Sequence, residues 1–210
     1  DNAYCVHHLY EDKQDYLLEI LMECKKAGNP DMVYKFSSTS KISFPGSGIA
    51  AMAASEANLK DIRDMMKYQT IGHDKVNQLR HVRFFKDVHG IVEHMKKHAD
   101  IMRPKFEAVI DGLERELGGL EIGSWIKPLG GYFISFDSLD GCAKAIVAKA
   151  KEAGLVMTGA GATYPYGKDP HDSNIRISPS YPTPEELAVA TEIFVLSVKL
   201  VSIDKILESK

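Results

Sequence analysis

Hydrophobic side chains recur at helical spacing along one long stretch of the chain. This stripe predicts an amphipathic helix over residues 86–117. Pro104 lies inside the stretch and is expected to kink the helix or to begin a new segment. The lack of an orderly charge pattern favours a strut between domains over a coiled coil. The stripe consists of Val88, Val92, Met95, Ala99, Met102, Phe106, Val109, Leu113 and Leu117.

Shorter helices are predicted on both sides of the long one. Apolar spacing indicates a helix over residues 16–26, alternating charge one over residues 58–68, and an alanine-rich composition one over residues 141–152. Each is followed within a few residues by glycine. Near the C-terminus, Thr183-Pro184-Glu185-Glu186 has the pattern of a capping box with proline at the first helical position. A helix is therefore expected from this box toward Leu207.

Short apolar runs bounded by turn residues predict the strands. The segments are 32–36, 48–54, 131–136, 155–157 and 174–178. Strands and helices alternate before the long helix, which is typical of an α/β sheet. After Gly118-Gly119 the pattern indicates a compact α+β unit. We therefore predict an α/β protein divided into residues 1–85, the helix 86–118 and residues 119–210.

Composition limits the function classes. The 210 residues are 44% hydrophobic and carry a formal net charge of -3, which gives no reason to expect nucleic acid or an anionic membrane as a partner. No apolar run approaches the roughly 20 residues of a membrane span. Three separated cysteines make neither a disulfide framework nor a metal site, so we expect a cytoplasmic protein without a metal. The opening residues 1–6 resemble the end of a strand, and we expect the C-terminal part of a longer protein.

One loop carries candidate chemistry. Residues 37–48, Ser-Ser-Thr-Ser-Lys-Ile-Ser-Phe-Pro-Gly-Ser-Gly, place Lys41 between hydroxyls and a glycine turn, directly after a predicted strand. Hydroxyls and glycine amides can surround a phosphate. A lysine in such a loop can become a carbonyl-seeking amine when it is desolvated. A solvated turn is the alternative interpretation.

Three further residues have both a structural and a chemical interpretation. Asp1 and Tyr4 can be a helix cap and a core ring. Arg176 lies between Ile175 and Ile177 on a predicted strand. Its guanidinium can point to solvent, or it can face a cleft and bind a carboxylate through two hydrogen bonds.

Taken together, residues spread over the whole chain resemble the C-terminal half of a fold-type-I aminotransferase that depends on pyridoxal 5'-phosphate. The resemblance implies a partial large-domain sheet in residues 1–85 and a small α+β domain in residues 119–210. The segment Tyr166-Gly167-Lys168-Asp169-Pro170 and the strand after it resemble a divergent, aspartate-aminotransferase-like subgroup. The residues that carry the resemblance are Asp1, Tyr4, Ser38, Ser40, Lys41, Gly130-Gly131-Tyr132-Phe133 and Arg176.

The resemblance implies a role for each residue. Lys41 would form the Schiff base with the cofactor and move the proton at the substrate α-carbon. Asp1 would keep the pyridine nitrogen protonated, and Tyr4 would donate to the phenolic oxygen of the cofactor. Two serines, Ser38 and Ser40, would contact the phosphate.

The last implied role is that of Arg176, which would hold the α-carboxylate of the amino acid. The implied reaction moves an amino group between an amino acid, with aspartate or another dicarboxylate suggested, and a 2-oxo acid. Many members of the family have an arginine soon after the lysine to neutralise the phosphate, but none occurs between Lys41 and Arg63. Hydroxyls and amides are the remaining candidates for that contact.

The resemblance covers only half of such an enzyme. A homodimer that includes the missing N-terminal part is implied, and this chain alone is expected to be inactive. Two alternatives remain open: lyase or decarboxylase chemistry with the same cofactor, and a non-catalytic effector-binding module of a transcription regulator. The pair His94 and His98 is interpreted as a solvated helix face, and His7-His8 as flanking the cofactor or lying on the surface.

Overall fold

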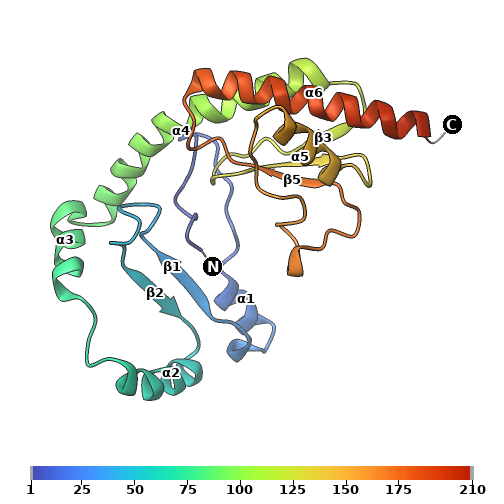
Figure 1. The fold of residues 1–210 in the computed structure, drawn as a ribbon. Coiled ribbons are helices and arrows are strands. Elements are labelled where there is room, and N and C mark those ends of the chain that lie inside the picture. Colours follow the sequence, from blue (N-terminus) through green and yellow to red (C-terminus); the bar gives the residue numbers. More distant parts are fainter. Residues whose placement is uncertain (1, 209–210) are drawn as a thin grey trace. The chain divides into compact units, whose positions relative to one another are not determined.

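The computed structural model describes residues 2–208 and separates into two compact units, residues 1–99 and 100–210 (Figure 1). Helix α4 (Val88–Leu117) contributes residues to both units. It contains Pro104 without interruption, so the proline does not begin a new segment. No helix among residues 2–208 is both long and apolar enough to cross a membrane.

The first unit is built around an antiparallel pair of strands, β1 (Lys35–Ser38) and β2 (Ala50–Ala53). In this pair Phe36 lies opposite Met52. The helices α1 (Ile20–Lys26), α2 (Glu56–Gln69) and α3 (Lys75–Phe85) surround it, with a short 3-10 helix, η1, over Pro30–Met32.

Side chains that cap α2 and α3 explain where these helices begin. The hydroxyl of Ser55 accepts a hydrogen bond from the backbone N–H of Asn58 at 3.2 Å. A carboxylate oxygen of Asp74 accepts one from the N–H of Asn77 at 2.9 Å. Both contacts satisfy N–H groups that have no partner inside the helix.

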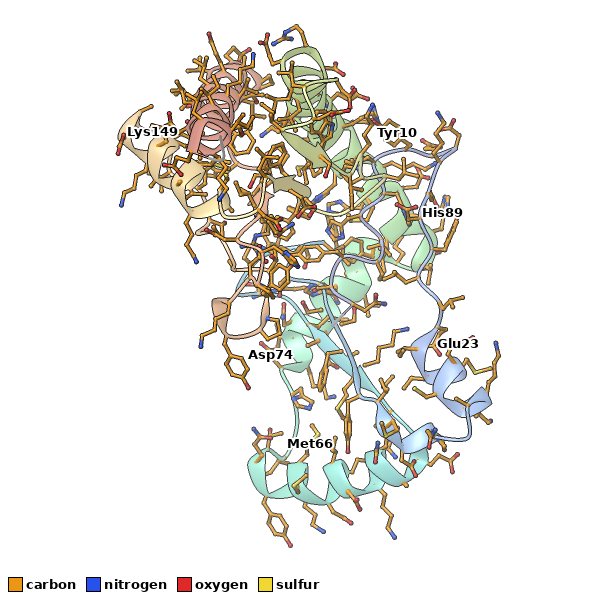
Figure 2. All side chains as sticks on the ribbon, turned by 90° about the vertical axis from the view of Figure 1, so that its right-hand side faces the viewer. Tyr10, Glu23, Met66, Asp74, His89 and Lys149 are labelled. Carbon is orange, nitrogen blue, oxygen red and sulfur yellow. The ribbon has the colours of Figure 1, made fainter. Side chains whose placement is uncertain are left out.

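Little of the first unit is buried. Its core cluster consists of Ile42, Phe85 and Met95, with Val6 and Ile91 packed against it. Strands β1 and β2 contain no buried residue, and Phe36 is 51% exposed. Helix α2 likewise buries none of its side chains, which are drawn in Figure 2. This sheet therefore lacks a packed face within the described part of the chain.

The second unit contains a three-stranded antiparallel sheet in the order β3 (Gly123–Trp125), β4 (Ile134–Ser138), β5 (Asn174–Ile177). Buried and half-buried positions alternate along β4, as expected for a strand with one face in the core. The ring of Phe136 stacks on Trp125 and meets Phe194 edge to face, with centroids 6.1 and 5.1 Å apart. A packed aromatic cluster thus covers one face of this sheet.

Two further helices complete the second unit. They are α5 (Ala143–Glu152) and α6 (Pro184–Glu208), and a 3-10 helix, η2, lies at Pro165–Gly167. The predicted capping box is confirmed: the N–H of Thr183 donates to Glu186 at 2.8 Å, and the N–H of Glu186 donates to Thr183 at 3.3 Å. A Cβ atom on Gly112 of α4 would lie 2.6 Å from the Thr191 side chain, so α4 and α6 pack closely at this glycine.

Several predicted segments were wrong in extent or type. The strand expected over 32–36 begins only at Lys35, because Pro30 starts a 3-10 turn that reaches Met32. The segment 155–157 is irregular, because it pairs with neither edge strand, β3 or β5, of the described sheet. The first helix begins at Ile20 and β4 at Ile134, both later than predicted. Helix α3 and strand β3 were not predicted.

Candidate functional site

The loop that joins β1 to β2 carries Lys41. The β1–β2 pairing extends into this loop, because the N–H of Thr39 donates to the carbonyl of Ile49 at 2.9 Å. The carbonyl of Thr39 then accepts from the N–H groups of Ile42 and Ser43, at 2.9 and 2.8 Å. One tight turn results, which buries Ile42 and leaves the Lys41 side chain exposed.

Two half-buried serine hydroxyls lie beside this turn. The hydroxyl of Ser38, at the end of β1, lies 3.3 Å from that of Ser40. A Cβ atom at position 48 would lie 2.9 Å from the backbone nitrogen of Ser40 and 3.1 Å from its hydroxyl. Glycine at position 48 therefore allows the returning chain to pass close to Ser40.

The start of the chain runs beside β1. The N–H of Asn2 donates to the carbonyl of Phe36 at 2.7 Å, and the hydroxyl of Ser37 donates to the carbonyl of Asn2 at 3.5 Å. Tyr4 follows and is 37% exposed. Asp1 lies outside the described residues. The first unit thus contains Tyr4, Ser38, Ser40 and Lys41 around one strand and its loop.

Histidines line the buried side of the Lys41 turn, which the sequence did not predict. His7 is only 6% exposed, and its Nε2 lies 3.0 Å from the Lys41 carbonyl oxygen. In α4, Nε2 of His94 lies 2.9 Å from the carbonyl oxygen of Ile42 and 3.1 Å from Nε2 of His98. The interpretation of His94 and His98 as a solvated face is therefore wrong: both are half-buried and hydrogen-bonded.

The environment of these rings shifts two pKa values downward. Burial lowers the pKa of His7, an effect that the carbonyls of Lys41 and Tyr4 partly oppose. Burial also lowers the pKa of His98, with smaller contributions from His94 and His7. At neutral pH the rings of His7 and His98 are therefore neutral, with one N–H donor each.

A fourth histidine, His81 in α3, holds the other side of the turn. Its Nδ1 lies 2.9 Å from the carbonyl oxygen of Asn77, which can only accept. With its hydrogen on Nδ1, the ring presents Nε2 as an acceptor to the hydroxyls of Ser43 and Thr39, at 2.7 and 3.1 Å.

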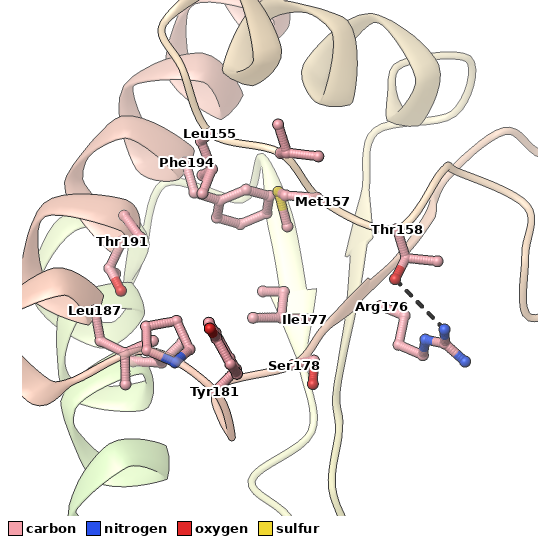
Figure 3. Close-up of a pocket in the computed structure, with 14 residues that line it drawn as sticks. Leu155, Met157, Thr158, Arg176, Ile177, Ser178, Tyr181, Leu187, Thr191 and Phe194 are labelled. Atoms are coloured by element: carbon pink, nitrogen blue, oxygen red, sulfur yellow. Dashed lines mark hydrogen bonds between the residues drawn. The ribbon is translucent and has the colours of Figure 1, made fainter.

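Arg176 lies in the second unit, on β5, and lines a cavity of about 300 Å³ (Figure 3). Its guanidinium carbon is 4.5 Å from the centre of the Phe133 ring, and its Nη2 donates to the hydroxyl of Thr158 at 3.4 Å. Its Nε is buried and has no hydrogen-bond partner within residues 2–208. This placement favours the predicted cleft over the solvent alternative. The lining also includes Leu155, Met157, Ile177, Tyr181, Leu187 and Phe194.

A carboxylate network fixes the strand that carries Arg176. The carboxylate of Asp169 accepts hydrogen bonds from the backbone N–H groups of Ser173 and Asn174, both at 2.8 Å, and these bonds lower its pKa. The Asn174 amide in turn donates to Ser135 and Asp137 of β4 at 2.9 and 2.8 Å. The start of β5 is thus tied both to the preceding loop and to its neighbouring strand.

The comparisons with known proteins agree on one family. A family model described as "Aspartate amino-transferase" matches residues 1–210. A Mycolicibacterium smegmatis protein named as a candidate aminotransferase is 45% identical over 183 residues, which cover 87% of this chain and 42% of that protein. An aspartate aminotransferase of Corynebacterium glutamicum is 41% identical over 192 residues, which cover 91% of this chain and 44% of that protein.

The structural comparison points the same way. A crystal structure of an aspartate transaminase from Corynebacterium glutamicum superimposes with a TM-score of 0.92 at 40% identity. The match covers 98% of this chain and 48% of that structure. The chain thus spans less than half the length of the curated relatives that it matches.

Proposed function

The chain belongs to the aspartate amino-transferase family, and we propose that it supplies the C-terminal half of an aminotransferase that depends on pyridoxal 5'-phosphate. The structural likeness confirms the expected fold-type-I architecture. The observation that carries the proposal is the loop after β1, where the exposed Lys41 directly follows Ser40, whose hydroxyl lies 3.3 Å from that of Ser38.

The chemistry of this donor set fits the cofactor. An amine can condense with the cofactor aldehyde, and the hydroxyls of Ser38 and Ser40 can donate to its phosphate. When bound, the cofactor would supply an electron sink for the pair left by the broken Cα–H bond. No arginine follows Lys41 before Arg63, so we assign the phosphate contact within this loop to hydroxyls and backbone amides.

The other residues have complementary tasks in this proposal. Lys41 holds the cofactor and carries the proton to and from the substrate α-carbon through Nζ. Asp1 carries the negative charge that pairs with the ring nitrogen, and Tyr4 donates to the phenolic oxygen. Arg176 binds the α-carboxylate of the amino acid, which would satisfy its buried and unpartnered Nε.

The substrates are an amino acid and a 2-oxo acid, and a dicarboxylate such as aspartate is our choice of donor because one relative is named for it. We propose a cytoplasmic homodimer in which the remaining half of the protein completes the site. Without that half, residues 1–210 would be inactive. No finding favours the lyase or the regulator alternative.

A matched pair of variants tests this function in the full-length protein. Lys41→Ala removes the proposed amine, whereas Lys35→Ala removes an amine on β1 that pairs with Glu19 at 2.8 Å. With aspartate and 2-oxoglutarate, Lys41→Ala should lower glutamate formation by about 10³-fold or more. Lys35→Ala should stay within about twofold of the wild type, because a surface ion pair contributes little.

Two results would contradict the proposal. If Lys41→Ala kept the wild-type rate, the lysine assignment would be wrong. If aspartate gave alanine and carbon dioxide without glutamate, the lyase or decarboxylase alternative would replace the transaminase.

A further inference from the structure

Two histidines from separate parts of the chain contact consecutive carbonyls of the Lys41 turn. His7 lies in the segment before α1, and its Nε2 is 3.0 Å from the Lys41 carbonyl oxygen. His94 lies in α4, and its Nε2 is 2.9 Å from the next carbonyl oxygen, that of Ile42. The turn that carries Lys41 is therefore held at two adjacent peptide groups by side chains distant in sequence.

The chemistry of the contacts determines where the protons lie. A carbonyl oxygen only accepts, so Nε2 of His7 must carry a hydrogen and donate it to Lys41. The same argument places a hydrogen on Nε2 of His94, directed at Ile42. Nε2 of His98, 3.1 Å away, then faces this hydrogen as an acceptor. The one hydrogen on Nε2 of His94 is thus shared between two acceptors, the Ile42 carbonyl oxygen and, at a slightly longer distance, Nε2 of His98.

Packing holds both rings in place. His94 meets Phe84 and Phe85 edge to face, each with ring centroids 5.4 Å apart. The His7 ring is buried and lies edge to face with Tyr4 at 5.6 Å, and its backbone N–H donates to the carbonyl of Tyr4 at 3.0 Å. His7 thereby connects two of the residues to which cofactor contacts are assigned, Tyr4 and Lys41.

We propose that His7 and His94 are positioning residues for Lys41, an inference that rests on the proposed role of Lys41 as the cofactor lysine. The Lys41 side chain is exposed and flexible, so the position of its amine depends on where its backbone is held. The two imidazole donors fix this backbone before the cofactor arrives. Because misplacement of a reacting group by about 1 Å can cost about 10²-fold in rate, such fixation affects chemistry as well as stability.

The test uses the full-length protein without cofactor and measures how fast it captures pyridoxal 5'-phosphate. His7→Leu and His94→Leu remove the imidazole N–H donor and fill its place with an apolar side chain. His7→Gln and His94→Gln restore an N–H donor near the position of Nε2. His89→Leu is the control, because His89 is exposed on α4 (Figure 2).

Each leucine variant should lower the second-order capture constant about five- to tenfold, the factor that corresponds to one hydrogen bond. Hydrogen exchange at the amides of Ile42 and Ser43, measured without cofactor, should become faster by a similar factor. The glutamine variants should recover most of both changes, and His89→Leu should change neither. The capture constant of each variant is divided by its folded fraction, which is obtained from a melting curve. A loss of stability alone therefore does not change the corrected constant.

Two results overturn the inference in distinguishable ways. After borohydride reduction, peptide mass analysis locates the captured cofactor. If it lies on Lys41 and the leucine variants melt earlier but capture at the wild-type rate, the histidines only stabilise the fold and the proposed function stands. If it lies on another lysine in the wild type, both the proposed function and this inference fail.

Discussion

The two units differ in how completely they bury their sheets. In the second unit, Ile134 and Phe136 of β4 are fully buried, and Phe136 packs edge to face against Phe194 of α6. In the first unit, β1 and β2 bury no residue, and Phe36 is half exposed. The second unit thus has a finished core, whereas the sheet that carries the Lys41 loop has none within the described residues. Under the proposed function, the exposed apolar positions of the first unit are where the remaining half of the protein would pack.

The sharpest test of this difference is a pair of phenylalanine truncations in the 210-residue chain. Phe136→Ala removes a fully buried ring and should lower the free energy of unfolding of the second unit by about 3–5 kcal/mol. Phe36→Ala removes a half-exposed ring and should cost less than about 1 kcal/mol. Both losses in the free energy of unfolding are measured by denaturant titration, with hydrogen exchange as the readout for each unit. Equal losses would mean that the first sheet is covered after all.

A second prediction concerns Arg176 in the packed second unit, whose buried Nε has no hydrogen-bond partner within residues 2–208. In the full-length protein, Arg176→Lys keeps the charge but loses the planar fork and the stacking on Phe133. It should lower kcat/KM by about 10²-fold, and Arg176→Ala should lower it further, because hydrogen bonds to charged groups contribute about 1.5–3 kcal/mol. Arg80→Ala, on the exposed side of α3, is the control. An unchanged kcat/KM in Arg176→Lys would show that the fork binds no substrate.

A third prediction tests the tight part of the first unit. Gly48→Ala would place a Cβ atom 2.9 Å from the Ser40 nitrogen and should destabilise the first unit by about 1–3 kcal/mol. Gly159→Ala, where nothing lies within 4 Å, should cost little. Thermal unfolding of both variants provides the comparison. If the two variants were equally stable, the close approach to Ser40 would be refuted.

The smallest predicted difference between the two units is in how their stability changes as the pH falls. Burial lowers the pKa of His7 and His98, so below the usual value of about 6.5 the unfolded chain binds protons that the folded first unit does not. The first unit should therefore lose stability as the pH falls below about 6.5 toward the lowered pKa values. The pKa of Asp169 in the second unit is also lowered, but its contribution disappears only below about 3.9.

Hydrogen exchange at pH 7.5, 6.0 and 5.0, corrected for intrinsic rates, separates the two responses. Protection of the amides around Ile42 should fall over this range, while protection of β4 should stay nearly constant. If amide protection fell in parallel in both units, the loss of stability would come from global unfolding and not from the histidines of the first unit.

The sequence predicted long elements well and short ones poorly. Helices α4, α5 and α6 followed from apolar spacing, from an alanine-rich composition and from the Thr183 capping box, which are local signals. The strand expected at 155–157 did not form, because a strand also needs a hydrogen-bonded neighbour and this segment pairs with neither β3 nor β5. Strand β3 has only three residues, which is too short for an alternation to be recognised.

In the candidate site, too, residues with a local sequence pattern were predicted and residues defined by long-range contacts were not. Lys41, its hydroxyl neighbours and Arg176 were named from local patterns and a family resemblance. For His7 the sequence left open whether it flanks the cofactor or lies on the surface. His94 and His98 were interpreted as a solvated helix face, because the contact of His94 with Ile42 joins positions 52 residues apart. Such contacts arise only when α4 packs against the turn, and no local spacing predicts them.

The most direct test of the central claim is chemical capture of the cofactor in the full-length protein. The protein is loaded with pyridoxal 5'-phosphate, reduced with borohydride, digested and analysed by peptide mass. A single pyridoxyl adduct on Lys41 is the predicted result. An adduct on a different lysine, or none on Lys41, would contradict the assignment.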